Sequence, residues 1–202
     1  MSLRRRYSGH GVTSYPPGRY FSEVSDLYTG KLLMVVDVSG SMEGERMSAA
    51  IGGSGELLSQ ALTDSYAVGL VAFSGSASLE LDLTTELRAV ERALSRLRIR
   101  WSGTDMSEGI KLAHRVLRTR RGERVMAIFS DGETDRPTAI AAALAARADG
   151  IRIIAALGGD ADPSFMRQVT GDDDEPLQVV PDSQVQAEIA GLAAKVPPTW
   201  SR

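Results

Sequence analysis

Apolar and polar residues along this chain form blocks that predict buried strands separated by helices. Short continuous apolar runs bounded by turn residues are typical of strands that are covered on both faces of a sheet. The segment from Leu79 to Leu83 instead alternates strictly between apolar and acidic residues, which predicts a half-exposed edge strand reached by an antiparallel turn. The expected buried strands are residues 31–36, 67–73, 125–129, 151–157 and a short strand at 177–180.

Between these runs, apolar residues recur at the spacing of an amphipathic helix. We expect Asp105 to cap one helix, with Glu108 completing a capping box. Three glycines lie inside the first helical pattern, at positions 52, 53 and 55, and we interpret them as a close approach of the helix backbone to the sheet. Alternating strands and helices predict a mostly parallel sheet with helices on both faces. The helical patterns cover residues 47–62, 87–97, 105–117, 135–148, a segment starting at Asp162, and 185–196.

Oxygen-bearing side chains follow the ends of these predicted elements in three places. Asp37, Ser39 and Ser41 come directly after the first strand, Thr104 lies where a helical pattern begins, and Asp131 ends another strand. Ligands of open α/β sheets bind outside the carboxyl ends of the strands, so the three loops meet if those two strands are neighbours. Hydroxyls and carboxylates suit a hard divalent cation such as Mg²⁺.

These five residues resemble the metal-ion-dependent adhesion site (MIDAS) of the von Willebrand factor type A family, in which Asp-x-Ser-x-Ser is followed by a Thr and by an Asp in a Ser-Asp-Gly context. The resemblance covers roughly residues 30–196. It implies a doubly wound, Rossmann-like three-layer α/β sandwich with a six-stranded, mostly parallel sheet in the order 3-2-1-4-5-6, strand 3 being antiparallel. We therefore divide the chain into an extended N-terminal arm (1–29), a von Willebrand factor A-like domain (30–197) and a C-terminal tail (198–202).

The resemblance also assigns roles to the five residues. Ser39, Ser41 and Thr104 would be direct ligands of Mg²⁺, or of Mn²⁺ or Ca²⁺, while Asp37 and Asp131 act largely through bound water. An open coordination position would then take a Glu or Asp side chain of a partner protein. We expect a metal-dependent protein-binding module and no enzyme. The alternative is a Mg²⁺-dependent hydrolase or phosphotransferase that uses Asp37, but Ser39 stands where such enzymes carry a second Asp.

Composition narrows the choice of partner and compartment. The chain has 202 residues, a formal charge of −3 and no cysteine, which argues against a nucleic-acid binder and excludes disulfides and thiolate metal sites. We expect no membrane segment and a cytoplasmic protein, because Arg4–Arg6 are not followed by an apolar stretch. Stand-alone prokaryotic relatives often work beside ATPases or in metal-chelatase assemblies, and we expect a partner of that kind.

Simpler interpretations stay open for several polar residues. Asp37 alone could be a turn residue, and Ser39 or Ser41 alone a helix N-cap, although capping gives no reason for three loops to converge. Glu133 could line the rim of the site or be a solvated loop residue. We interpret the following as structural or solvated residues: His10, His114, the acidic run 172–175, and the arginines at 96, 98, 100, 118, 120, 121 and 124.

Overall fold

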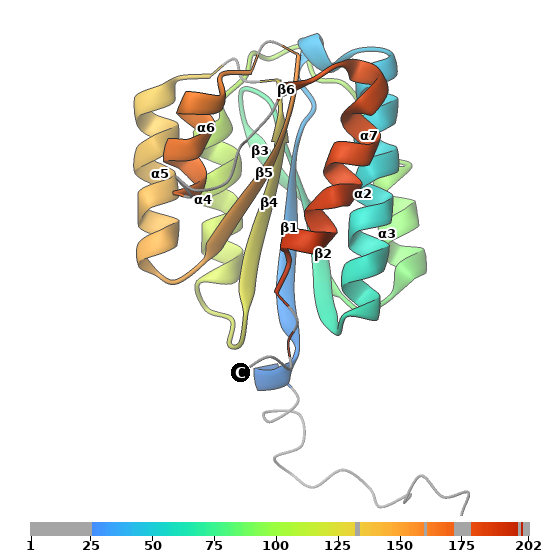
Figure 1. Cartoon of the computed structure of the whole chain (residues 1–202), viewed down its shortest axis with the longest axis vertical. Helices are drawn as coiled ribbons and strands as arrows, with labels where there is room; N and C mark the ends of the chain where they lie inside the picture. Colours follow the sequence, from blue (N-terminus) through green and yellow to red (C-terminus); the bar gives the residue numbers. More distant parts are fainter. Residues whose placement is uncertain (1–25, 132–133, 160, 172–178, 198, 200–202) are drawn as a thin grey trace, which may run out of the picture.

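One sheet in the order β3-β2-β1-β4-β5-β6 forms the centre of the molecule in the computed structural model (Figure 1). The structure describes residues 26–131, 134–159, 161–171, 179–197 and 199. Five strands have seven or eight residues and β6 has two. The strands are β1 (Gly30–Asp37), β2 (Tyr66–Phe73), β3 (Ala77–Thr84), β4 (Arg124–Ser130), β5 (Arg152–Gly158) and β6 (Val179–Val180).

The neighbours of the first strand confirm the condition on which the predicted site depends. Strand β1 pairs in parallel with β2 on one side and with β4 on the other, so the strand ends that carry Asp37 and Asp131 are adjacent. All eight residues of β1 are buried, as expected for a continuous apolar run in the middle of a sheet. Strand β3 is antiparallel to β2, and none of its residues is fully buried, which confirms the predicted edge strand.

Helices cover both faces of the sheet and bury one apolar core on each side (Figure 1). On one face lie α2 (Glu45–Thr63), α3 (Leu87–Leu94) and α7 (Asp182–Gly191), and on the other α4 (Met106–Leu117), α5 (Arg136–Ala148) and α6 (Pro163–Thr170). Two short 3₁₀ helices are also present, η1 (Gly40–Met42) after β1 and η2 (Leu192–Lys195) after α7. The three layers follow from strands that are apolar on both sides and helices that are apolar on one.

The helix caps agree in part with the sequence. The Asp105 carboxylate accepts a hydrogen bond from the Ser107 amide at 3.0 Å, so the predicted N-cap is confirmed. The capping box is wrong, because the Glu108 carboxylate pairs with Lys111 at 2.9 Å instead of turning back to the cap.

The glycines of α2 approach another helix and not the sheet, which corrects the prediction. A Cβ atom on Gly53 would lie 2.6 Å from the Gln186 carbonyl oxygen and 2.7 Å from the Ile189 Cβ, both on α7. A Cβ on Gly55 would lie 3.6 Å from a methyl group of Leu94 on α3. Gly53 therefore lets the backbones of α2 and α7 pack closely, whereas Gly55 has room for a side chain.

The ends of the chain add little to this picture. Residues 26–28 are helical, while residues 1–25 of the expected arm and most of the expected tail lie outside the described residues. The proposed boundaries at 29/30 and 197/198 stay predictions. Within the described part of the chain, every helix is too short or too polar to cross a lipid bilayer.

Candidate metal centre

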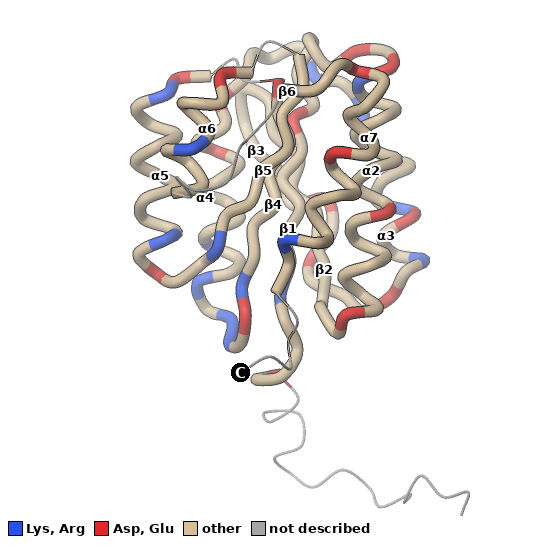
Figure 2. Tube along the Cα trace, in the orientation of Figure 1, with Lys and Arg blue, Asp and Glu red and all other residues tan. Residues whose placement is uncertain are grey.

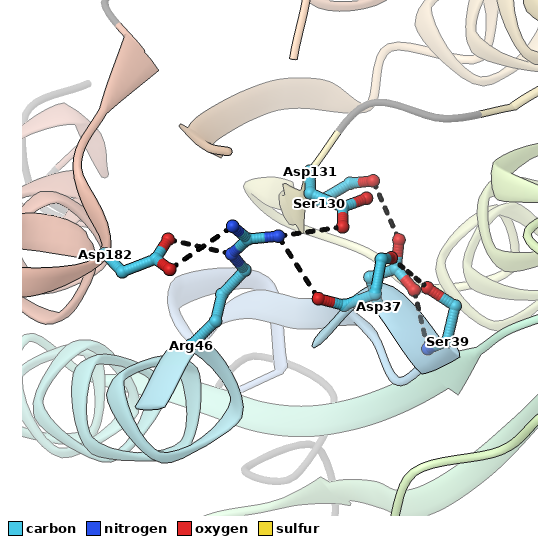
Figure 3. A network of polar contacts seen from close by, with 7 residues as sticks. Asp37, Ser39, Arg46, Ser130, Asp131 and Asp182 are labelled. Carbon is cyan, nitrogen blue, oxygen red and sulfur yellow. Dashed lines mark hydrogen bonds and ion pairs between the residues drawn. The ribbon is translucent and has the colours of Figure 1, made fainter. Parts of the chain in front are cut away.

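Asp37 is the last residue of β1 and is completely buried. One carboxylate oxygen accepts a hydrogen bond from the Ser39 amide at 2.8 Å, and the other accepts one from the Ser130 hydroxyl at 2.9 Å. Ser130 ends β4, the neighbouring strand, so the pairing of β1 with β4 brings it to Asp37. These two donors fix the orientation of the carboxylate at the edge of the sheet (Figure 3).

Ser39 and Ser41 lie in the turn that leads from β1 into α2. Their hydroxyl oxygens are 3.1 Å apart, and Ser39 is buried while Ser41 is exposed. The 3₁₀ helix η1 begins directly after Ser39, so the chain turns tightly enough there for the two hydroxyls to contact each other. Two hydroxyls therefore lie together beside the Asp37 carboxylate.

Asp131 follows β4 and is held by Arg46 of α2. The Arg46 guanidinium donates from Nη1 to Asp131 Oδ2 and to the Ser41 carbonyl, each at 3.2 Å. Its other nitrogens bind the Asp182 carboxylate at the start of α7, at 2.8 and 3.2 Å (Figure 3). The second oxygen of Asp131, Oδ1, is buried and has no hydrogen-bond partner among the described residues.

Thr104 is half-buried in the loop before α4 and takes no part in this network of contacts within the described residues. Its loop is nevertheless tied to the loop after β1 and to the turn after β2. The Arg100 amide donates to the Val38 carbonyl at 2.7 Å, and the Asp105 amide donates to the Ser74 carbonyl at 2.6 Å. The structure thus joins Asp37, Ser39, Ser41 and Asp131 in one cluster and leaves Thr104 in a neighbouring segment.

The burial of Asp37 has an electrostatic consequence. The net effect of its surroundings raises its pKa from 3.8 to about 6: loss of water is the largest cause, the negative charge of Asp131 acts in the same direction, and the hydrogen bonds from Ser39 and Ser130 oppose both. A buried carboxylate pair of this kind is stabilised in its charged form by a nearby cation. Arg46 supplies one positive charge, shared between Asp131 and Asp182.

The donor set fits a small hard cation. Two carboxylates and two hydroxyls lie at one edge of the sheet, and Asp131 Oδ1 is a buried acceptor that lacks a donor. Mg²⁺ accepts such oxygen ligands and keeps several waters, so a site rich in hydroxyls can hold it. Among the described residues, no group of three or more His, Asp and Glu side chains is placed to bind a metal ion, so this mixed cluster is the candidate.

Two contributors were not predicted from the sequence. In the sequence Ser130 is only the residue before Asp131, yet in the structure its hydroxyl donates directly to the Asp37 carboxylate. Arg46 has no motif that marks it, because its partner Asp182 lies 136 residues away. Once β1 and β4 are paired, Ser130 can be found from the register. Val36 pairs with Phe129, so Asp37 and Ser130 are the next residues on the two strands.

The remaining polar candidates lie elsewhere. The His114 ring nitrogen is 2.6 Å from the Asp149 carboxylate, which agrees with a structural role. Basic residues gather at the connection between α4 and β4, at the opposite end of the sheet from the site (Figure 2). Glu133 and the acidic run 172–175 lie outside the described residues.

Sequence comparison covers the part of the chain that carries this cluster. Residues 32–133, which are more than half of the chain, match the sequence profile of the von Willebrand factor type A domain. The chain belongs to the von Willebrand factor type A domain family. The matched stretch of this family member runs from β1 to the end of β4 and includes all five predicted residues. No curated protein sequence matches the chain.

Solved structures share the fold at low sequence identity. The conserved hypothetical protein BatB from Bacteroides thetaiotaomicron is 20% identical, with a TM-score of 0.70 over 83% of this chain and 98% of that one. The von Willebrand factor domain of the type V pili tip protein Mfa5 from Porphyromonas gingivalis is 13% identical, with a TM-score of 0.73 over 83% and 95%. Proximal thread matrix protein 1 from the mussel byssus, described with a zinc-occupied MIDAS motif, is 15% identical, with a TM-score of 0.69 over 86% and 50%.

Proposed function

We propose that this von Willebrand factor type A domain is a metal-dependent protein-binding module. A Mg²⁺ ion, or Mn²⁺ or Ca²⁺ in its place, is held at the carboxyl edge of the sheet by Asp37, Ser39, Ser41, Thr104 and Asp131, and a partner's Glu or Asp side chain completes the coordination. The observation that carries the proposal is the buried Asp131 Oδ1, which has no donor among the described residues and lies in a cluster of oxygen atoms. The zinc-occupied motif of the byssus protein supports a metal in this family.

The contacts of the cluster favour binding over catalysis. Both oxygens of Asp37 already accept hydrogen bonds, and the Ser39 hydroxyl is paired with that of Ser41. A nucleophilic serine needs a general base such as His or Lys within hydrogen-bond reach, and among the described residues the Ser39 hydroxyl contacts only the Ser41 hydroxyl and the buried Asp37 carboxylate. We therefore propose a non-enzymatic role and place the hydrolase or phosphotransferase alternative second.

The test is capture of a partner from a native lysate of the source cells. We expect capture by the immobilised full chain to require Mg²⁺ or Mn²⁺ and to disappear in chelator and in Asp37→Ala, while circular dichroism shows that the fold is retained. Capture that is indifferent to chelator and to the substitution would reject the proposal. Turnover of phosphate esters that depends on Mg²⁺ would support the enzyme alternative instead.

The partner and the compartment are further parts of the proposal. An ATPase or chelatase-type assembly in the cytoplasm is the first candidate, on the strength of the family resemblance alone. Mass spectrometry of the captured proteins identifies the partner, and cell fractionation locates the domain. A pilus or surface protein in the captured fraction would move the function to adhesion.

A further inference from the structure

Trp101 is the most exposed large hydrophobic residue in the described part of the chain, with 74% of its surface open to solvent. It lies in the loop between α3 and α4 that also carries Thr104. The neighbouring Ser102 and Gly103 are exposed as well. Burial of a tryptophan side chain stabilises a protein more than burial of almost any other side chain. A tryptophan exposed beside the candidate site is therefore a candidate for contact with a partner.

The indole ring lies directly on the turn of the candidate metal centre. A Cβ atom on Gly40 would come within 2.4 Å of ring atoms Cε3 and Cζ3, so only a glycine allows this contact. Gly40 is the residue between Ser39 and Ser41, whose hydroxyls contact each other at 3.1 Å in the cluster. The hydrogen bond from the Arg100 amide to the Val38 carbonyl, at 2.7 Å, holds the Trp101 loop against the turn after β1.

We propose that Trp101 is a second contact point for the partner, which packs an apolar side chain on the indole while its carboxylate binds the metal. This inference rests on the proposed function and adds the kind of segment that is recognised, an acidic residue with an apolar residue beside it. The ring lies one residue from the two hydroxyls, so neighbouring side chains of one segment reach both. Tryptophan held in place before binding is the residue type that most often dominates an interface.

The positive charge of a bound metal ion favours an apolar partner side chain over a cationic one on the Trp101 ring. Indole rings also attract Lys and Arg, but a dication held by Ser39 and Ser41 would lie beside Gly40, on which the ring packs. A cationic side chain on the indole would meet the repulsion of that dication, whereas an apolar side chain loses water at no electrostatic cost.

Two short peptides test the inference on the full chain. The probes are acetyl-Gly-Glu-Gly-amide and acetyl-Leu-Glu-Leu-amide, titrated in saturating Mg²⁺ and in chelator while the indole N–H signal of ¹⁵N-labelled tryptophan is followed by NMR. The variant Trp200→Phe assigns the Trp101 signal. We expect the leucine peptide to bind roughly five-fold more tightly than the glycine peptide, because part of a leucine side chain is buried.

Matched variants show where that difference comes from. Trp101→Ser should reduce the affinity for the leucine peptide to that for the glycine peptide, and Trp101→Phe should keep most of the difference. Tyr28→Ser is the control, since Tyr28 is 69% exposed and lies before the start of β1, at the other end of the strand from the site. It should leave both affinities unchanged.

The possible failures are distinguishable. Equal, Mg²⁺-dependent affinities for the two peptides in the unmodified chain, or a difference that survives Trp101→Ser, would overturn the role of Trp101 and leave the metal-dependent function standing. Absence of binding by both peptides, or binding that persists in chelator, would overturn the proposed function and this inference with it.

Discussion

At the scale of single residues, the Asp37 carboxylate at the end of β1 is buried where a neutral side chain would make the folded state more stable. Asp37 is buried next to Asp131, and its pKa is raised to about 6 from 3.8. The folded chain therefore holds the Asp37 proton more strongly than the unfolded chain does. The stability that this group contributes is fully present below pH 3.8 and is lost as the pH rises through 6.

This leads to a prediction for Asp37→Asn in the absence of metal. The rise of the Asp37 pKa from 3.8 to about 6 corresponds to about 3 kcal/mol, so at about pH 7.5 we expect the substitution to raise the free energy of unfolding by about 1–3 kcal/mol. An asparagine can keep both hydrogen bonds, because the Ser130 hydroxyl can accept instead of donate. At about pH 4 the effect should be close to zero, since the wild-type group is then largely protonated.

Urea denaturation in chelator at the two pH values measures the change. Asp82→Asn is the control, because the Asp82 side chain is 66% exposed on β3, and we expect it to change stability by less than about 0.5 kcal/mol at either pH. A loss of stability in Asp37→Asn at neutral pH would show that the charged carboxylate is stabilised by the protein without a metal.

At the scale of elements, Arg46 joins the site to two helices. It extends from α2 to Asp131 after β4 and to Asp182 at the start of α7. A dication bound to Asp131 and the guanidinium attract the same negative charge and repel each other. Arg46 thus stabilises the metal-free cluster and weakens the attraction of the cluster for a metal.

We therefore predict opposite effects of Arg46→Met on folding and on metal binding. The free energy of unfolding in chelator should fall by about 1–3 kcal/mol, because a buried carboxylate loses its partner. The affinity for Mg²⁺, measured by calorimetry, should rise several-fold. Lys111→Met removes a cation from the exposed face of α4 and should change neither quantity. Weaker Mg²⁺ binding in Arg46→Met would mean that Arg46 mainly positions Asp131.

The contact between α2 and α7 gives a matched pair of glycine substitutions. Gly53→Ala should lower the free energy of unfolding by about 1–3 kcal/mol, because its methyl group would overlap the α7 backbone at 2.6 Å. Gly55→Ala should raise it by about 0.5–1 kcal/mol, because its nearest neighbour is 3.6 Å away and alanine favours the helix. Chemical denaturation of both variants tests this, and equal effects would contradict the packing described.

These elements also show what the sequence can and cannot predict. Continuous apolar runs predict the strands because burial on both faces leaves no alternation, and alternation in β3 predicts the edge. The four clustered site residues could be predicted because their strands end at the same edge. The sequence does not predict the roles of Gly53, Arg46 and Trp101. Each role depends on a contact with a segment distant in sequence or on a loop conformation without periodicity.

At the scale of the whole molecule, the site collects residues from widely separated parts of the chain. Asp37 ends β1, Arg46 belongs to α2, Ser130 ends β4 and Asp182 begins α7. The cluster therefore exists only when the sheet and the helices of one face have assembled. A ligand that binds such a cluster binds the folded state and not the unfolded chain, so it stabilises the entire domain.

This gives a quantitative prediction for Mg²⁺. Once its concentration exceeds the dissociation constant, each tenfold increase should raise the free energy of unfolding by about 1.4 kcal/mol, because one ion is released on unfolding. The urea midpoint should therefore shift upward while the slope of the transition stays constant, since the folded surface is unchanged. Asp37→Asn should be more stable than the wild type in chelator and respond little to Mg²⁺, so the two stability curves cross as the metal is added. Parallel curves would show that the ion acts by general salt effects and not through this cluster, and Na⁺ at matched ionic strength separates the two cases.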